Sequence, residues 1–193
     1  MKWKLHHYGI LAATILLLGV LVGYSLIKSN IVPVARVNGD VILLSEVKDN
    51  AAVSAKLYEQ APELVGVQDT ELAALFESEN TEALFARSLE SSIVSAILRS
   101  SVPKETLREA DRLATRSVAE ANIRALGAAL KNQYGWDVEV FKERVVEPQV
   151  LRQLLAKTHG DSYEEWLRAA RENANVNLWF IPFDWSGGEL IEK

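Results

Sequence analysis

The most strongly patterned part of the chain is an uncharged apolar run near its N-terminus. Residues 8–27 read YGILAATILLLGVLVGYSLI and contain no charged side chain. About 20 apolar residues in a helix cross the roughly 30 Å hydrocarbon core of a membrane. Lys2 and Lys4 precede the run, and the positive-inside rule keeps such an end in the cytoplasm. No small-x-small cleavage pattern follows, so the run predicts a signal-anchor rather than a cleaved signal peptide. Residues 1–28 are therefore expected to form a cytoplasmic N-terminus and a transmembrane helix.

The pattern changes after this run. Residues 29–33 are expected to form a short tether, and the next segment carries Asn38-Gly39 between two short runs of β-forming residues, 34–37 and 41–43. Both positions of an Asn-Gly pair tolerate the positive φ that a two-residue hairpin turn requires. The pattern therefore predicts a small β-hairpin at the start of the exterior part of the chain.

Apolar residues then recur at helical spacing. A helix is expected over residues 46–60, which Pro62 helps to close, and a weaker one over 71–77. Asn80 is suited to capping a stronger helix that covers residues 83–98.

A longer helical pattern follows. Pro103, at a first-turn position, begins a helix whose alanine-rich stripe continues to about Gln133. The pattern predicts one helix of about 30 residues, roughly 45 Å long. Gly135 is suited to a left-handed position just past its end.

Three further elements are expected in the last third of the chain. Asp137 should cap a helix that Pro148 kinks and that ends at His159-Gly160. Asp161 and Glu164 stand at the spacing of a capping box, which predicts the start of another helix.

The C-terminal segment is expected to close the fold. Residues 176–183 are rich in β-forming residues and predict a strand. A two-stranded hairpin is only marginally stable by itself in water, so we expect this strand to pair with residues 34–37. Residues 184–193 are expected to be a polar tail. The fold class that follows is mostly α with a small β element, in which residues 34–183 form one domain after the transmembrane helix.

Charge and cysteine content exclude several classes of function. Two of the 21 basic residues and none of the 26 acidic residues precede the apolar run, so the rest of the chain has a net charge of −7. An acidic domain without a long basic run argues against a nucleic-acid partner. The chain has no cysteine, which excludes a disulfide framework, a thiolate metal site and a lipidated cysteine anchor.

No pattern of catalytic residues emerges. The chain contains no HExxH, GxSxG, P-loop or GxGxxG sequence. His6 and His7 precede the apolar run, and His159 near a helix C-terminus is explained by the helix dipole. The acidic residues between Asp137 and Glu147 are best interpreted as a solvated helix face. No catalytic residue, cofactor or metal site is predicted.

Aromatic residues near helix ends are the candidates for binding. Most aromatic residues at helical spacing belong to a core, but some could line a groove for extended or amphipathic peptides. The residues at helix ends and breaks, where full burial is hardest, are Tyr134, Trp136, Phe141 and Trp166.

The order of these segments resembles a known family. VARVNGDVILLSE at residues 34–46, SSVPKETLREA at 100–110, QYGWDVEVFKERVVEPQVLRQLLAK at 133–157 and EEWLRAARENANVNLWF at 164–180 resemble successive parts of the SurA-type N-terminal chaperone domain. PrsA-type foldases share this domain. The V-N-G-D-x-I element is the most informative of these matches.

Two features depart from the family's pattern. Trp136-Asp137 stands where the family has a Ser or Thr cap. Foldase members also carry a parvulin isomerase domain of about a hundred residues, a whole domain by size, whereas only residues 158–175 lie between the corresponding segments here. The isomerase domain is therefore expected to be absent.

The resemblance implies a membrane-anchored, holdase-like chaperone without enzymatic activity. Its expected partners are unfolded or translocating polypeptides, and its expected place is the outer face of the cytoplasmic membrane. Two alternatives stay open at this point. One is a scaffold domain that binds a single fixed membrane or envelope partner, and the other is a prolyl isomerase, which would require the parvulin domain.

Overall fold

The structure, a computed structural model, describes residues 32–65, 81–120 and 123–193. These residues form a mostly helical fold with a small β element, as the pattern predicts. The predicted anchor, the first part of the tether, the predicted 71–77 helix and Asn80 lie outside the described residues. In the ranges that the structure describes, no helix is both long and apolar enough to cross a membrane.

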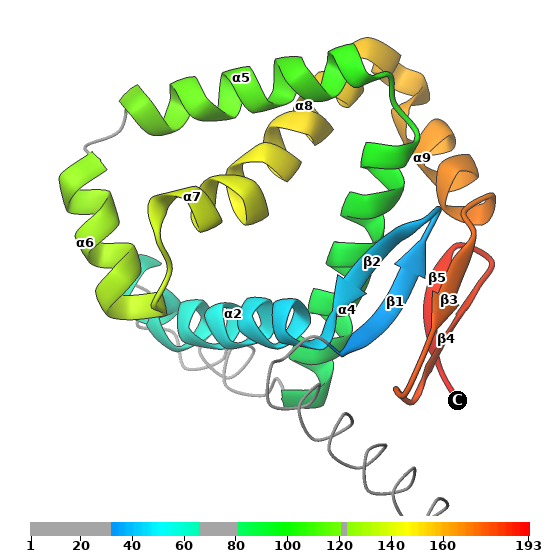
Figure 1. Ribbon diagram of the computed structural model, residues 1–193, viewed down its shortest axis with the longest axis horizontal. Coiled ribbons are helices and arrows are strands. Elements are labelled where there is room, and N and C mark those ends of the chain that lie inside the picture. Colours follow the sequence, from blue (N-terminus) through cyan, green and yellow to red (C-terminus); the bar gives the residue numbers. More distant parts are fainter. Residues whose placement is uncertain (1–31, 66–80, 121–122) are drawn as a thin grey trace, which may run out of the picture.

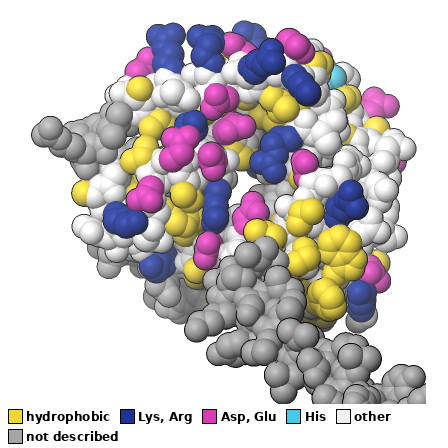
Figure 2. Space-filling view, in the orientation of Figure 1, with side chains coloured by type: hydrophobic (Ala, Val, Ile, Leu, Met, Phe, Trp, Pro, Cys, Tyr) yellow, Lys and Arg dark blue, Asp and Glu magenta, His cyan; other side chains and the backbone are white. Residues whose placement is uncertain are grey.

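Four helices surround a diagonal segment (Figure 1). They are α2 (Leu44–Val65), α4 (Thr81–Ser100), α5 (Lys104–Glu120) and α6 (Ile123–Tyr134). The diagonal segment contains α7 (Val138–Phe141), the π-helical turn η1 (Lys142–Val146) and α8 (Glu147–His159). It runs from the end of α6 to the corner where α4 and α5 meet, with α5 and α2 on opposite sides. Acidic and basic side chains are interspersed on this face of the molecule (Figure 2).

The prediction of a single long helix between Pro103 and Gln133 is wrong. The structure has two helices, α5 and α6, which run in clearly different directions on either side of residues 121–122. Each contacts a different part of the diagonal segment, since α5 packs against α8 and η1 while α6 packs against α7. Ala110 and Ala114 are buried on α5, whereas Ala128 on α6 is exposed, so tertiary contacts override the continuity of the alanine stripe.

The predicted hairpin is confirmed. Strands β1 (Pro33–Val37) and β2 (Asp40–Leu43) pair antiparallel, and Asn38 and Gly39 both have positive φ, 49° and 107°. Asn38 also joins distant parts of the chain. Its backbone N–H donates to the Asn175 carbonyl at 2.9 Å, and its side-chain amide donates to the Ser100 hydroxyl at 2.8 Å.

The predicted closing of the fold is also confirmed, with a shorter strand. β3 (Val176–Leu178) pairs antiparallel with β1, so the three-stranded sheet has the order β2-β1-β3. The extended run does not continue to residue 183 as expected, because Phe180 has a left-handed backbone with φ 59°. A β-strand cannot pass through such a conformation, so the ladder ends before it.

The prediction of a polar tail at residues 184–193 is wrong. Strands β4 (Phe183–Ser186) and β5 (Glu189–Glu192) form a second hairpin. Its turn is Gly187-Gly188, where both glycines have positive φ, 59° and 85°. Arg171 of helix α9 (Tyr163–Glu172) holds this turn, since its Nε donates to the Gly188 carbonyl at 2.6 Å and its guanidinium also pairs with Glu90 of α4.

Several predicted helix boundaries need correction. α2 runs three residues past Pro62, because the fixed φ of proline is itself helical and a proline removes only its own N–H. Pro148 interrupts the diagonal helix as expected, but the interruption takes the form of the π-helical turn η1 directly before it. This wider turn is the local adjustment that accommodates the missing donor.

The two capping side chains predicted for the later helices do not act as caps. Asp137 occupies the N-cap position of α7 without a capping hydrogen bond, and its Oδ1 instead accepts from Lys131 Nζ at 3.1 Å. Asp161 lies in a 3₁₀ turn, η2 (Gly160–Ser162), and Ser162 takes the N-cap position of α9, so the capping box with Glu164 does not form. Gly160 ends α8 as expected, with φ 53°.

Two hydrophobic clusters stabilise the described domain. The first joins the sheet to α4 and the C-terminal hairpin, and its members include Val34, Val37, Ile93, Ile97 and Phe183. The second lies where α4, α5 and α8 meet, around Val94, Leu98, Ala110, Leu151 and Leu155. Helix α4 contributes to both clusters, so its position is fixed from two sides.

Candidate functional site, a cleft between α2, α4 and the π-helical turn

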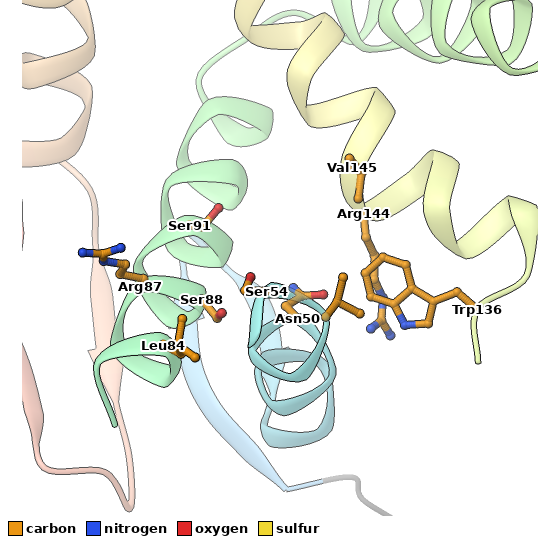
Figure 3. A pocket seen from close by; sticks show the side chains of 10 residues that line it. Asn50, Ser54, Leu84, Arg87, Ser88, Ser91, Trp136, Arg144 and Val145 are labelled. Atoms are coloured by element: carbon orange, nitrogen blue, oxygen red, sulfur yellow. The ribbon is translucent and has the colours of Figure 1, made fainter. Parts of the chain in front are cut away.

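The clearest candidate site is a cleft between α2 and α4 on one side and η1 on the other. It consists of two adjoining hollows of about 290 and 280 Å³, and both hollows are lined by Asn50, Ser91 and Arg144. Figure 3 shows Asn50 and Ser54 of α2 between Ser88 of α4 and the pair formed by Trp136 and Arg144. These volumes are near the lower end of those found for ligand pockets.

The wall that α4 provides contains a row of serine side chains together with Leu84, Arg87 and Arg99. Ser88, Ser91, Ser92 and Ser95 recur at helical spacing and line one hollow or both. Ser88 and Ser92 are buried, whereas Ser91 is exposed. A serine side chain is too short to reach the facing segment, and this leaves open space where leucine or isoleucine would make a closed core. The serine row is therefore the direct cause of the cleft.

Asn50 lines both hollows, but its side-chain oxygen is buried. Within the part of the chain that the structure describes, this Oδ1 has no hydrogen-bond partner. A buried polar atom left without a partner costs about 1–3 kcal/mol. Asn50 therefore lowers the stability of the α2 wall of the cleft.

Trp136 and Arg144 form the opposite wall. Trp136 is 8% exposed, and the Arg144 guanidinium carbon lies 5.6 Å from the centroid of its ring, within the range of a cation–π contact. Arg144 Nη1 also lies 3.3 Å from Asp49 Oδ2 of α2, so this side chain joins the two walls. Val145, the next residue of the π-helical turn, lines the cleft and is 37% exposed.

Lys142 fixes the π-helical turn against α5. Its Nζ lies 2.7 Å from Glu139 Oε1 and 3.1 Å from Asp111 Oδ1 of α5. The hydrogen bonds to Glu139 and then to Asp111 raise the pKa of Lys142 above its usual range, so it stays charged at physiological pH. Arg144 and Val145 follow in the same turn and are thereby held at the cleft.

Glu147, at the start of α8, lines a smaller neighbouring hollow with Ser95 and Leu151 rather than the cleft itself, and its pKa is perturbed. Its burial, followed by the negative charge of Asp111, raises the pKa of its carboxyl, while Arg99 and Lys142 act in the opposite direction. Ionisation of this carboxyl therefore costs free energy in the folded domain.

The four aromatic residues predicted as a binding group do not gather at one place. Tyr134 and Trp136 are neighbours at the α6–α7 turn, with ring centroids 6.5 Å apart, and of the four only Trp136 lines the described cleft. Phe141 is half-buried at the end of α7. Trp166 lies on α9, where it stacks on His159 with a centroid distance of 4.4 Å and packs against the second hydrophobic cluster.

Sequence reasoning missed the polar residues of the cleft, above all Asn50, Ser91 and Arg144. The signal that could have indicated them is the serine row, because four serines recur at helical spacing on one face of α4 and two of them, Ser88 and Ser92, are buried. In the described ranges, no group of three His, Cys, Asp or Glu side chains is placed to hold a metal ion.

Comparison with known proteins found no match. No family model, curated protein or solved structure matches the chain.

Proposed function

We propose that this protein is a membrane-anchored, extracytoplasmic chaperone of the holdase kind, which binds unfolded or exported polypeptides without covalent chemistry. The uncharged run at residues 8–27 would hold it in the cytoplasmic membrane with the folded domain outside. The resemblance to the SurA-type N-terminal domain supports the same proposal, through the V-N-G-D-x-I element and the return of the last segment to the first strand.

The observation that carries the proposal is the make-up of the cleft. Small hydroxyl side chains of α4 face an indole ring and the exposed Val145 across an open space. Val145 and the exposed part of Trp136 can contact apolar side chains without selecting among them, while the serine hydroxyls can hydrogen-bond to a peptide backbone. A chaperone needs this combination, because its clients share a backbone and apolar residues rather than a sequence.

The test fills the cleft from the serine row. Ser91 is exposed, lines both hollows and lies inside α4, so Ser91→Trp should occupy the cleft with little effect on stability. We expect the variant to lose most of the protection that the wild-type chain gives to an aggregating client, measured by light scattering. Binding of a fluorescently labelled unfolded polypeptide, followed by anisotropy, should weaken in parallel.

Ser117→Trp is the matched control. Ser117 is also an exposed serine inside a helix, but it lies on α5 and outside the cleft. If an added indole ring merely makes the surface adhesive, both variants should change alike. If the wild-type chain binds no unfolded polypeptide at tens of micromolar, the chaperone proposal fails and the fixed-partner scaffold replaces it.

A further inference from the structure

A second surface, outside the cleft, exposes large apolar side chains. Phe180 is 89% exposed, Val41 is 54% exposed and Trp179 is 36% exposed. Val41 pairs with Arg36, which pairs with Asn177, and Trp179 follows Asn177 by two residues. Trp179 and Phe180 are consecutive residues of the β3–β4 connection and form an exposed aromatic patch at the end of the sheet. Val41 lies nearer the hairpin turn, and the exposed polar residues Arg36 and Asn177 stand between it and this patch.

The backbone of Phe180 adds to the significance of the patch. Its φ of 59° is uncommon for a residue other than glycine and is unfavourable for a bulky one. Backbone conformations of this kind persist where something else over-determines them, and they concentrate at functional sites. Here the phenyl ring points away from the fold, so packing within the domain does not offset the cost of the unfavourable backbone conformation.

The patch lies where the chain enters the domain. The Trp179 N–H donates to the Val34 carbonyl at 3.0 Å, and the Leu44 N–H donates to the Val32 carbonyl at 2.8 Å. Residues 28–31 alone separate Val32 from the uncharged run at residues 8–27, which ends the apolar part of the predicted anchor. An extended chain spans at most about 3.3–3.6 Å per residue, so Val32 can be no farther than about 18 Å from the end of the anchor. This end of the sheet is therefore held close to the membrane surface.

The chemistry of the patch suits a lipid surface. Tryptophan and other aromatic side chains favour the membrane–water interface, where one part of the ring is apolar and another is hydrated. One exposed cation, Arg36, lies on the outer face of the sheet. Lys193 Nζ lies 3.5 Å from the Ile181 carbonyl oxygen, but it also pairs with Asp184 Oδ1 at 3.3 Å, so its charge is balanced. The exterior part of the chain has a net charge of −7, so its overall charge does not attract anionic lipids. The apolar side chains must supply most of the affinity.

We infer that Trp179 and Phe180 insert into the interfacial layer of the bilayer that holds the anchor, and that they orient the domain with α5 pointing away from the membrane. In Figure 1, α5 lies at the opposite end of the molecule from the β3–β4 connection. The inference rests on the membrane anchor of the proposed function, but it does not require that the cleft bind a client.

The absence of cysteine allows a direct test in the full chain. Asn177→Cys places a single fluorescent label beside Trp179, and Glu105→Cys places the same label on exposed α5 as a control. Each labelled chain is inserted into phospholipid nanodiscs that carry a quencher on the lipid acyl chains near the headgroups. We expect strong quenching at position 177 and almost none at position 105. Adding Trp179→Ser and Phe180→Ser should reduce quenching at position 177 to the level of the control.

Three results would overturn the inference. The label at position 177 could be as unquenched as the control, or its quenching could persist after both aromatic side chains are removed. Protection of the label from an aqueous quencher only in nanodiscs with two chains would show that a second copy covers the patch. The client assay on the same nanodiscs separates the two proposals. Quenching without client protection leaves the docking intact and refutes the chaperone, whereas client protection without quenching refutes the docking alone.

Discussion

Two phenylalanines, three residues apart, provide a sharp test of how the C-terminal segment contributes to stability. Phe183 is 6% exposed and belongs to the first hydrophobic cluster, with Val34 and Val37 of β1 and with Ile93 and Ile97 of α4. Phe180 is 89% exposed. The two side chains are identical in size, so Phe183→Ala and Phe180→Ala remove the same atoms from opposite environments.

The expected difference is large. Truncation of a buried phenylalanine to alanine costs about 3–5 kcal/mol, because burial is lost and a cavity remains. Against a total stability of about 5–15 kcal/mol, that loss is a considerable fraction. At about 2–4 °C per kcal/mol for a domain of roughly this size, Phe183→Ala should lower the melting temperature by about 6–20 °C. Phe180→Ala should change stability by no more than about 0.5 kcal/mol, as is usual for exposed positions.

The measurement is urea unfolding of the full chain in detergent micelles, followed by circular dichroism at helical wavelengths. The midpoint should fall for Phe183→Ala with an unchanged slope, and it should stay at the wild-type value for Phe180→Ala. Similar midpoints for the two variants would refute the packing of the C-terminal hairpin against β1 and α4. A lower midpoint for Phe180→Ala alone would show that Phe180, rather than Phe183, is the buried residue.

Two further predictions concern the C-terminal strands and the half-buried carboxyl of Glu147. Deletion of residues 175–193 removes β3 and the second hairpin, and it should abolish the cooperative unfolding transition, whereas an unchanged transition would show that these strands are an appendage. Burial raises the pKa of Glu147, so its ionisation opposes folding as pH rises from the unfolded value of about 4.3 through the folded one. Glu147→Gln should therefore raise the melting temperature at pH 7.5 and lose that advantage at pH 4. A lower melting temperature at pH 7.5 would mean that attraction to Arg99 and Lys142 outweighs the burial.

Local sequence signals predicted the turns of this fold better than its long elements. Asn38-Gly39 indicated the first hairpin because the requirement for positive φ acts within two residues. Gly187-Gly188 has the same property, but the polar residues around it concealed the second hairpin. That hairpin needs only Phe183 as a fully buried apolar residue, since Arg171 holds its turn through a hydrogen bond to Gly188.

The break between α5 and α6 could not be predicted from helical periodicity. No proline or glycine stands between Glu120 and Ile123, and the alanine stripe passes through the break. Two helices form instead of one because α5 packs against α8 and α6 packs against α7. These are tertiary contacts, which helical periodicity along the sequence does not show. Asn122, a residue type favoured at helix N-termini, is the weak signal that the sequence offered.

The cleft was harder to predict for the same reason. Its walls come from Asn50, Ser91 and Arg144, which lie about 40 to 50 residues apart along the chain. Hydrophobic patterning assigns each of them to a helix, but it does not show that the three helices face one another. Trp136 was predicted correctly as a residue near a helix break, and the structure places it in the cleft wall.

Helix α4 connects the two surfaces to which we assign binding. Its Ile93 and Ile97 side chains pack against the sheet, while Ser91 and Ser95 face the cleft. Because Val94 and Leu98 also anchor α4 against α8, the helix cannot rotate or slide without breaking one of the two clusters. A sheet docked on a membrane would therefore fix the direction in which the cleft opens. A polypeptide emerging from the same membrane would then meet a cleft of constant height and orientation, and binding would require no movement of the domain.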